Sequence, residues 1–223
     1  THVNNWLKQG AIMMAHLHAG NLSKFYVPEL CRLVEIYSNW GNCERKGAKP
    51  TFIPSLRQNF DGQWATNALE LGWKIAFTGN SDDHMARPGW SGWHRIERVY
   101  HGGLTAVYTN EPTRKGIFSA LKNRNTYATS GSRIIIETTM NGTLPGSELR
   151  SMDSLHIHYY LKDSCLIEKI ELVHNGQTVQ ARVIDSSESS GEFLCGQKSG
   201  YYYLRIIQRN GHHAWTSPWY VHQ

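Results

Sequence analysis

Residues 73–84 have the sequence WKIAFTGNSDDH, in which a short apolar run passes directly into a polar loop. The run predicts a buried strand that ends in a loop with two aspartates and a histidine. Similar short apolar runs predict three more strands, at 11–15, 33–37 and 104–108. Helical patterns separate these strands, at 63–71 and 114–123. Thr113 is the expected N-cap of the second helix, which has Ile117, Phe118 and Leu121 on one apolar face. Alternating strands and helices are typical of a parallel α/β fold.

The composition changes character near residue 130. After it the sequence predicts six strands in succession, at 133–140, 155–161, 167–174, 178–184, 201–208 and 219–222. Asn-Gly pairs at 141, 175 and 210 mark turns between them. We therefore expect two domains, an α/β part over 1–130 and an antiparallel β-sandwich over 131–223.

The composition also limits the classes of partner. The chain has 223 residues and a net charge of +5, and its apolar runs are only a few residues long. A membrane-spanning helix needs about 20 apolar residues, so we expect no membrane span. The densest basic stretch, 114–124, has apolar residues interleaved at helical spacing. We interpret it as a solvated helix face and expect no nucleic-acid partner.

Histidine and carboxylate side chains follow two of the predicted strands. His16 and His18 come after the run 11–15, and Asp82 and His84 come after 73–78. An Asp-x-His pair is a compact chelating unit, and His16 can complete a site for zinc, manganese or iron. Alternatively, Asp82 caps a local turn and His16 is a satisfied core histidine. Because these side chains all follow strand ends of one α/β segment, we favour the metal site.

The ordered motifs resemble a known superfamily. The segment 79–84 is similar to the late Gly-Ser-Asp-x-His motif of the PHP (polymerase and histidinol phosphatase) superfamily. The order of His16, the strand 33–37, a helix and then the Asp-x-His loop matches as well. Several further segments look like an uncharacterised, often exported branch of that superfamily with an appended β-sandwich, at 35–38, 80–89, 103–108, 127–131 and 214–218.

The resemblance implies a fold and an activity. The fold is the C-terminal half of a distorted (β/α)7 PHP-type barrel, a TIM-like barrel, followed by an antiparallel β-sandwich. The activity is hydrolysis of a small phosphorylated or other anionic substrate, with up to three divalent transition metal ions (Zn, Mn or Fe). The branch's export implies a periplasmic or secreted location.

The resemblance also assigns roles to residues. His16, Asp82 and His84 match metal-ligand positions. Glu35 matches a characteristic carboxylate of the catalytic site, which either binds a metal itself or contacts a residue that does. His18 is a third-site ligand, a proton donor to the leaving group, or a bystander. Arg87 follows the motif and either meets the substrate anion or forms a structural ion pair.

The chain departs from the superfamily at its beginning. Such proteins start with a His-x-His motif, whereas only His2 lies upstream of His16. We therefore expect the N-terminal half of the barrel to be missing, and to lie in the same precursor or in a separate chain. The rival hypothesis is a non-catalytic extracellular scaffold or assembly module on a degenerate fold of this kind, because a truncated barrel exposes strand edges.

Three features of the C-terminal part have two interpretations each. Cys165 and Cys195 either form a disulfide or are small buried residues. The alternating rings of 201–203 either fill the core or bind carbohydrate, and we favour the core. His156 and His158 lie on one face of a strand, as a metal pair would. No third ligand is evident near them in the sequence, so we interpret them as surface or cross-strand packing.

Overall fold

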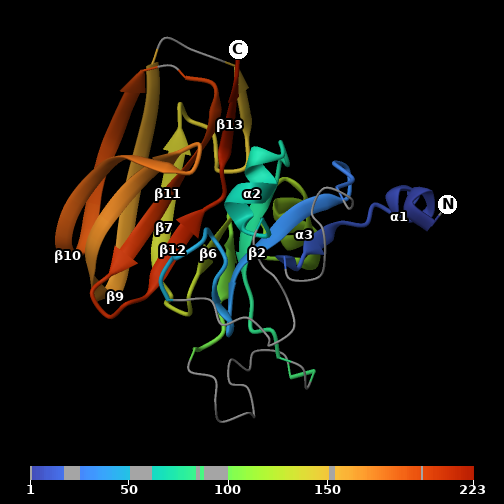
Figure 1. Ribbon diagram of the computed structural model, residues 1–223, viewed down its shortest axis with the longest axis horizontal. Coiled ribbons are helices and arrows are strands. Elements are labelled where there is room, and N and C mark those ends of the chain that lie inside the picture. Colours follow the sequence, from blue (N-terminus) through green and yellow to red (C-terminus); the bar gives the residue numbers. More distant parts are fainter. Residues whose placement is uncertain are drawn as a thin grey trace.

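The computed structural model describes residues 2–17, 26–50, 62–83, 86–87, 100–150, 154–196 and 198–223. Within these residues the chain forms two sheets and three helices (Figure 1). The smaller sheet contains β1 (Met13–Ala15), β2 (Cys31–Ser38), β3 (Gly41–Asn42) and β4 (Ala76–Gly79). The central strand is β2, which pairs in parallel with β1 and β4 and forms a short hairpin with β3. The smaller sheet is thus largely parallel.

The three helices are α1 (His2–Lys8), α2 (Ala65–Glu70) and α3 (Arg114–Lys122). Because α2 connects the parallel strands β2 and β4, these three elements form one βαβ unit. The Thr113 hydroxyl accepts a hydrogen bond from the Gly116 N–H at 3.1 Å. This contact satisfies one of the unpaired N–H groups at the start of α3 and confirms the predicted cap.

The larger sheet has nine strands. They are β5 (Leu104–Val107), β6 (Thr126–Thr129), β7 (Ile135–Met140), β8 (Glu148–Arg150), β9 (Ser154–His174), β10 (Gln177–Gly196), β11 (Gly200–Gln208), β12 (His213–Thr216) and β13 (Trp219–His222). All pairs are antiparallel except β8 with β13. The first half of β9 pairs with β7 and its second half pairs with β11. The sheet therefore curls into a sandwich-like arrangement (Figure 1).

The expected half of a (β/α)7 barrel is wrong for this chain, and the TIM-like barrel is wrong with it. A barrel of that kind repeats parallel strand–helix units, but only one helical crossover between parallel strands is seen in the described residues. After β4, the next two strands, β5 and β6, pair antiparallel and join the larger sheet. The alternation of strands and helices in the sequence was correct in outline. It does not fix whether successive strands pair in parallel.

Two apolar cores lie on opposite sides of β11. Tyr201 and Tyr203 pack into the core shared with the smaller sheet, whereas Tyr202 and Leu204 pack into the core of the larger sheet. Successive side chains of a strand point to opposite faces, so one strand serves both cores. The three tyrosine rings are thus core residues, as the sequence favoured.

The outer edge of β4 is closed by side-chain hydroxyls instead of another strand. These belong to β5, β6, β13 and the β12–β13 connection: Thr105, Thr126, Ser217 and Tyr220. They pair with the N–H and C=O groups of Ile75, Phe77 and Gly79, at distances between 2.6 and 3.0 Å. Alternate residues of a strand direct their backbone groups to one edge, so these hydroxyls satisfy the whole edge.

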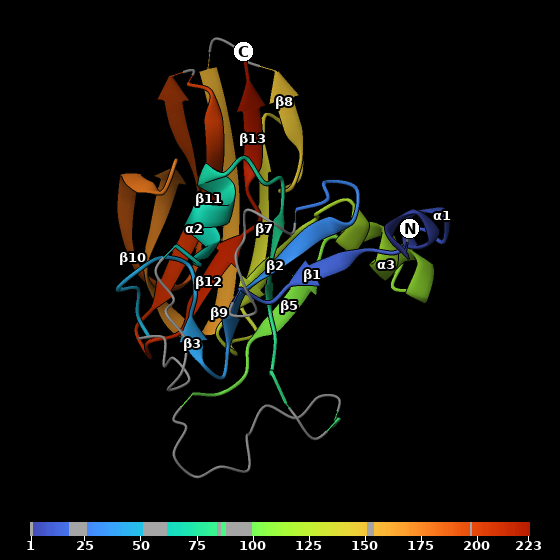
Figure 2. The ribbon, with the colours of Figure 1, turned by 45° about the vertical axis from the view of Figure 1, so that its right-hand side comes forward.

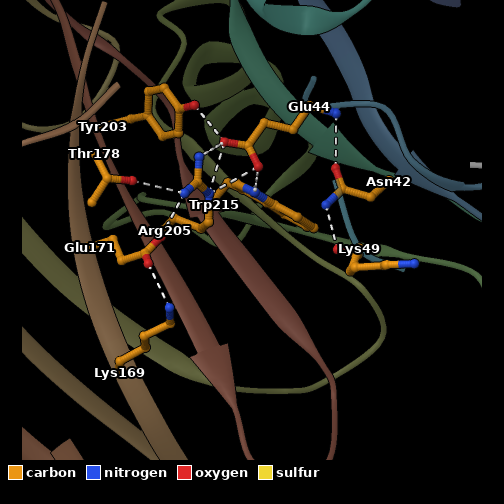
Figure 3. Close-up of polar contacts among 9 residues, drawn as sticks. All are labelled: Asn42, Glu44, Lys49, Lys169, Glu171, Thr178, Tyr203, Arg205 and Trp215. Carbon is orange, nitrogen blue, oxygen red and sulfur yellow. Dashed lines mark hydrogen bonds and ion pairs between the residues drawn. The ribbon is translucent and has the colours of Figure 1, made fainter. Parts of the chain in front are cut away.

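A buried carboxylate joins the two sheets (Figure 3). Glu44, which follows β3, is 1% exposed. It accepts hydrogen bonds from the Arg205 guanidinium, from the Tyr203 hydroxyl at 2.5 Å and from the Trp215 indole at 3.0 Å. Arg205 also donates to Glu171 at 2.6 Å. Burial alone would lower the pKa of Arg205, but the charge and hydrogen bonds of Glu44 outweigh burial and raise it.

The four cysteines all lie within the described residues and are reduced thiols. Cys195 is paired across the ladder with Leu155, which lies ten residues before Cys165 in the same strand. A disulfide needs Cα atoms within about 7 Å. The pairing of β9 with β10 therefore keeps Cys165 and Cys195 apart.

None of the helices in the described residues has both the length and the apolar character that crossing a bilayer requires.

The Glu44 cluster yields a prediction about stability. We expect Glu44→Gln to lower the free energy of unfolding by about 3 to 5 kcal/mol, because it leaves the buried Arg205 charge undercompensated. Urea unfolding followed by circular dichroism measures this loss. Glu188→Gln is the matched control, since Glu188 forms an exposed pair with Lys162 and should leave the midpoint almost unchanged. Equal effects of the two changes would contradict a structural role for Glu44.

The closed edge of β4 yields a second prediction. The Tyr220 hydroxyl accepts from Ile75 N–H at 2.7 Å and donates to Ile75 C=O at 2.6 Å. We expect Tyr220→Phe to cost about 1 to 3 kcal/mol, because it leaves buried backbone groups unpaired. The same urea assay measures the change. Tyr160→Phe removes an exposed hydroxyl that contacts Glu188 and serves as control. Unfolding at the wild-type midpoint in Tyr220→Phe would show that this edge is not held by the hydroxyl.

Candidate functional site

The parallel strands of the smaller sheet bring the predicted site residues to one edge, the one formed by the carboxyl ends of β1, β2 and β4. Ala15 lies beside Val34, and Glu35 lies beside Thr78 in the strand register. His16 therefore follows β1 next to Glu35, and the loop after β4 starts at the same level. In α/β sheets ligands bind at the carboxyl ends of parallel strands. This edge of the smaller sheet is the candidate site.

Glu35 is the centre of the site. It is 6% exposed, and each of its carboxylate oxygens has a partner. Oε1 lies 3.2 Å from His16 Nδ1, and Oε2 accepts a hydrogen bond from Asn80 Nδ2 at 2.9 Å. The side chain of His16 is 43% exposed. The site thus has a buried carboxylate beneath an imidazole that reaches solvent.

Two carboxylates act on the His16 imidazole. The hydrogen bond to Glu35 raises the pKa of His16, and the charges of Glu35 and Asp82 add to this effect, while burial opposes it. Burial also raises the pKa of the nearby Cys43 thiol, with smaller contributions from Glu35 and Asp82. The thiol is therefore neutral, and the site favours a positive charge at the imidazole.

The loop after β4 contains an ion pair. Asp83 accepts hydrogen bonds from the Arg87 backbone N–H at 3.0 Å and from Arg87 Nη2 at 2.7 Å. Asp82, just before it, has a positive φ of 51°, a conformation that aspartate tolerates better than most residues. Arg87 was expected either to meet the substrate anion or to form a structural ion pair, and the ion pair is present in the structure. A contact with a substrate anion stays a prediction.

The predicted metal-ligand set is only partly visible. His16 and Asp82 lie at the same edge of the sheet, but His84 and His18 lie outside the described residues. Among the described residues, no three His, Cys, Asp or Glu side chains are arranged to hold a metal ion as they stand. The proposed set of three ligands therefore stays a prediction.

Sequence reasoning gave no role to Asn80 or Cys43. Asn80 lies inside the motif that was singled out, and its position at the strand end could have been used to assign it. Cys43 follows the β3 hairpin and comes near Glu35 only because β3 folds back on β2. No local signal in the sequence marks Cys43.

A family match corrects the superfamily suggested by the motifs. Residues 58–158, less than half of the chain, match DUF3604, described as a protein of unknown function. The PHP superfamily gives no match. The resemblance to that superfamily is therefore wrong. It depended on short motifs. The chain contains these motifs in the matching order, but its strands do not form the barrel that they implied.

Similar proteins come from chlamydiae. An uncharacterized protein of Chlamydia muridarum is 31% identical over 218 residues, which cover 86% of this chain and 35% of the relative. An uncharacterized protein of Chlamydia trachomatis is 30% identical, over 90% of this chain and 36% of the relative. The chain thus spans about a third of the length of these relatives.

One solved structure shares a limited likeness. It contains the fibronectin(III)-like modules of Clostridium thermocellum CbhA, with a TM-score of 0.27 and 15% identity. The likeness covers 38% of this chain and 94% of that one. At this TM-score we draw nothing from it about fold or function.

The contact between His16 and Glu35 can be tested in metal-free protein. We expect Glu35→Gln to lower the pKa of His16, measured by NMR titration of the imidazole. Because the folded pKa lies above the ordinary 6.5, the pair stabilises the protein below pH 6.5. That contribution is lost as the pH rises through the raised pKa. Glu192→Gln, far along the chain in β10, should not change the titration of His16. An unaltered pKa in Glu35→Gln would exclude the contact.

Proposed function

We propose that this chain carries part of a metal-dependent hydrolase that cleaves phosphoesters by metal-activated water. The observation that supports this most is the meeting of His16, Glu35 and Asp82 at the carboxyl ends of three parallel strands. Imidazole and carboxylate groups, here those of His16 and Asp82, are donors that suit zinc, manganese or iron. The donor chemistry therefore fits a divalent transition metal, although the described residues supply only part of a complete set.

On this proposal His16 and Asp82 hold the metal, and His84 completes the set. A bound ion would supply a water of lowered pKa and neutralise charge on the phosphoryl oxygens. Because the chain spans about a third of its chlamydial relatives, the remaining ligands come from another segment of a longer protein or from a separate chain. The activity belongs to that complete protein.

Glu35 orients the site. Its Oε2 is held by Asn80 and its Oε1 faces His16, so the carboxylate cannot turn without losing a partner. A buried carboxylate with fixed oxygens positions an imidazole or accepts a proton from a neighbouring water. We assign both tasks to Glu35. His18 is then the proton donor to the leaving group.

The substrate on this proposal is a small anionic ester. Asp83 sets the position of the Arg87 guanidinium by accepting hydrogen bonds from Arg87 Nε at 3.3 Å and from Arg87 Nη2 at 2.7 Å. A guanidinium held in this way presents a planar donor group that matches a phosphate. Arg87 therefore contacts the substrate anion on this proposal, and a periplasmic or secreted location remains the expectation.

The proposal predicts a coupled loss of metal and activity. In the complete protein, we expect His16→Ala and Asp82→Ala to remove at least one equivalent of transition metal. Hydrolysis of an aryl phosphate should fall by about 100-fold or more, since the metal generates the nucleophile. Elemental analysis and a colorimetric assay measure the two quantities. His222→Ala is the control, because His222 lies 3.3 Å from Glu148 in an exposed pair. Wild-type metal content and hydrolysis in both site variants would refute the proposal.

A specific surface favours the second candidate, an assembly module. Five large apolar side chains are 40–47% exposed: Trp6, Met13, Met14, Ile117 and Phe118. They lie on α1, β1 and α3, which are grouped on one side of the molecule (Figure 2). The sequence predicted an apolar face on α3, and it is this face that is left exposed. Exposed apolar surface of this kind favours contact with another protein surface. A metal-free, inactive complete protein would support this candidate.

A further inference from the structure

Two histidines of β9 lie on the exposed face of the larger sheet. His156 and His158 are two residues apart in a strand, so their side chains point to the same face. Their ring centroids are 6.5 Å apart and their planes differ by 28°. The side chains are 46% and 61% exposed. The candidate site at the smaller sheet uses neither of them.

The structure supplies a third group that is distant in the sequence. Glu192 of β10 is paired directly with His158 across the β9–β10 ladder. One oxygen, Glu192 Oε2, lies 3.5 Å from His158 Nδ1 and 3.9 Å from His156 Nδ1. A single carboxylate oxygen therefore faces both imidazoles. The Ser154 hydroxyl lies 3.0 Å from His156 Nε2 on the same face.

We propose that His156, His158 and Glu192 form a binding site for a divalent transition metal ion, with Zn²⁺ as the fitting ion. Two imidazoles and one carboxylate are an established zinc donor set that leaves a fourth position for water. Ligand atoms about 2.0 to 2.1 Å from a tetrahedral zinc ion lie roughly 3.3 Å from one another. The two contacts to Glu192 are only a few tenths of an ångström longer than this.

Binding requires a small rearrangement. In the structure, the ligand atoms of these three side chains do not surround one point. The same is true of every group of three His, Cys, Asp or Glu side chains among the described residues. The two rings must approach each other, and all three side chains are more than 40% exposed. They can rotate without disturbing the core, while the ladder fixes their Cα positions. Exposure also keeps the cost of desolvating the ligands low.

A bound ion would link β9 to β10. In the strand order of the described residues, β10 is at the end of the larger sheet and pairs only with β9. An ion held by both strands therefore fastens an outer strand to its one neighbour. Because the ion binds the folded hairpin better than the unfolded chain, zinc should also raise the melting temperature.

Zinc titration of the 223-residue chain tests this proposal. We expect isothermal titration calorimetry with ZnCl2 at pH 7.5 to detect a site that weakens at least about tenfold in His158→Ala and in Glu192→Gln, since even indirect partners of a metal are worth that much. Glu192→Gln keeps the shape of the side chain and so separates loss of a ligand from loss of folding. Circular dichroism checks the fold of each variant.

Two controls separate this site from others. His222→Ala removes an exposed histidine that also has a carboxylate neighbour, Glu148, and should leave the zinc affinity unchanged. The titrations are repeated in the His16→Ala background, which removes the ligand proposed at the smaller sheet, so that zinc bound there does not enter the measurement. Zinc binding of unchanged strength when His156→Ala and His158→Ala are added to this background, in a folded protein, would overturn the proposal. Absence of binding to the wild-type chain would overturn it equally.

Discussion

The buried contact of Glu44 with Arg205 is the interaction on which the arrangement of the two sheets depends. Glu44 comes from the segment after β3, and its partners come from β11 and β12. A buried charge is tolerated only when it is paired and its oxygens are hydrogen-bonded, so the three donor groups around this carboxylate cannot be moved independently. The two sheets can meet in only one way that satisfies all of them.

The same segment also positions α2. Cys43 and Glu44 accept hydrogen bonds through their backbone carbonyls from the first N–H groups of this helix, at 2.9 and 3.0 Å. The N-terminus of the helix, the end of β2 and the larger sheet are therefore fixed by one turn of chain. This turn and the hydroxyls that pair with the edge of β4 together fix where the parallel strands end relative to one another. Glu35 meets His16 at these strand ends.

The two proposed metal sites illustrate different physical situations. At the smaller sheet, Glu35 is buried and its partners are fixed, so the site resists change and its ligands are incomplete within the described residues. On the larger sheet, the proposed ligands are exposed, while the backbone beneath them is fixed by the β9–β10 ladder. The first arrangement suits chemistry on a substrate. The second suits reversible binding of an ion that bridges strands.

The sequence by itself determined most of the local structure. Apolar runs marked the strands around β1, β2, β4 and β5, and Thr113 marked the start of α3, because these signals involve neighbours in the chain. The residue pattern also identified His16 and Asp82 as site candidates, whereas Glu35 was named only through the resemblance that the family match corrects. It could not fix the pairing of strands, which depends on surfaces far apart in the chain. The two strands predicted at 155–161 and 167–174 are one strand, β9, since β7 and β11 pair with its two halves.

Only the tertiary structure decided the polar partnerships. Glu44 and Arg205 are 161 positions apart, and Glu192 is 34 positions from His158. No local pattern indicates such pairs, because a carboxylate near a turn or on a strand is ordinarily solvated. The ladder between β9 and β10 brings Glu192 to the two histidines, and the docking of the two sheets buries Glu44. The sequence supplied the charged groups, and long-range burial and strand pairing selected which of them meet.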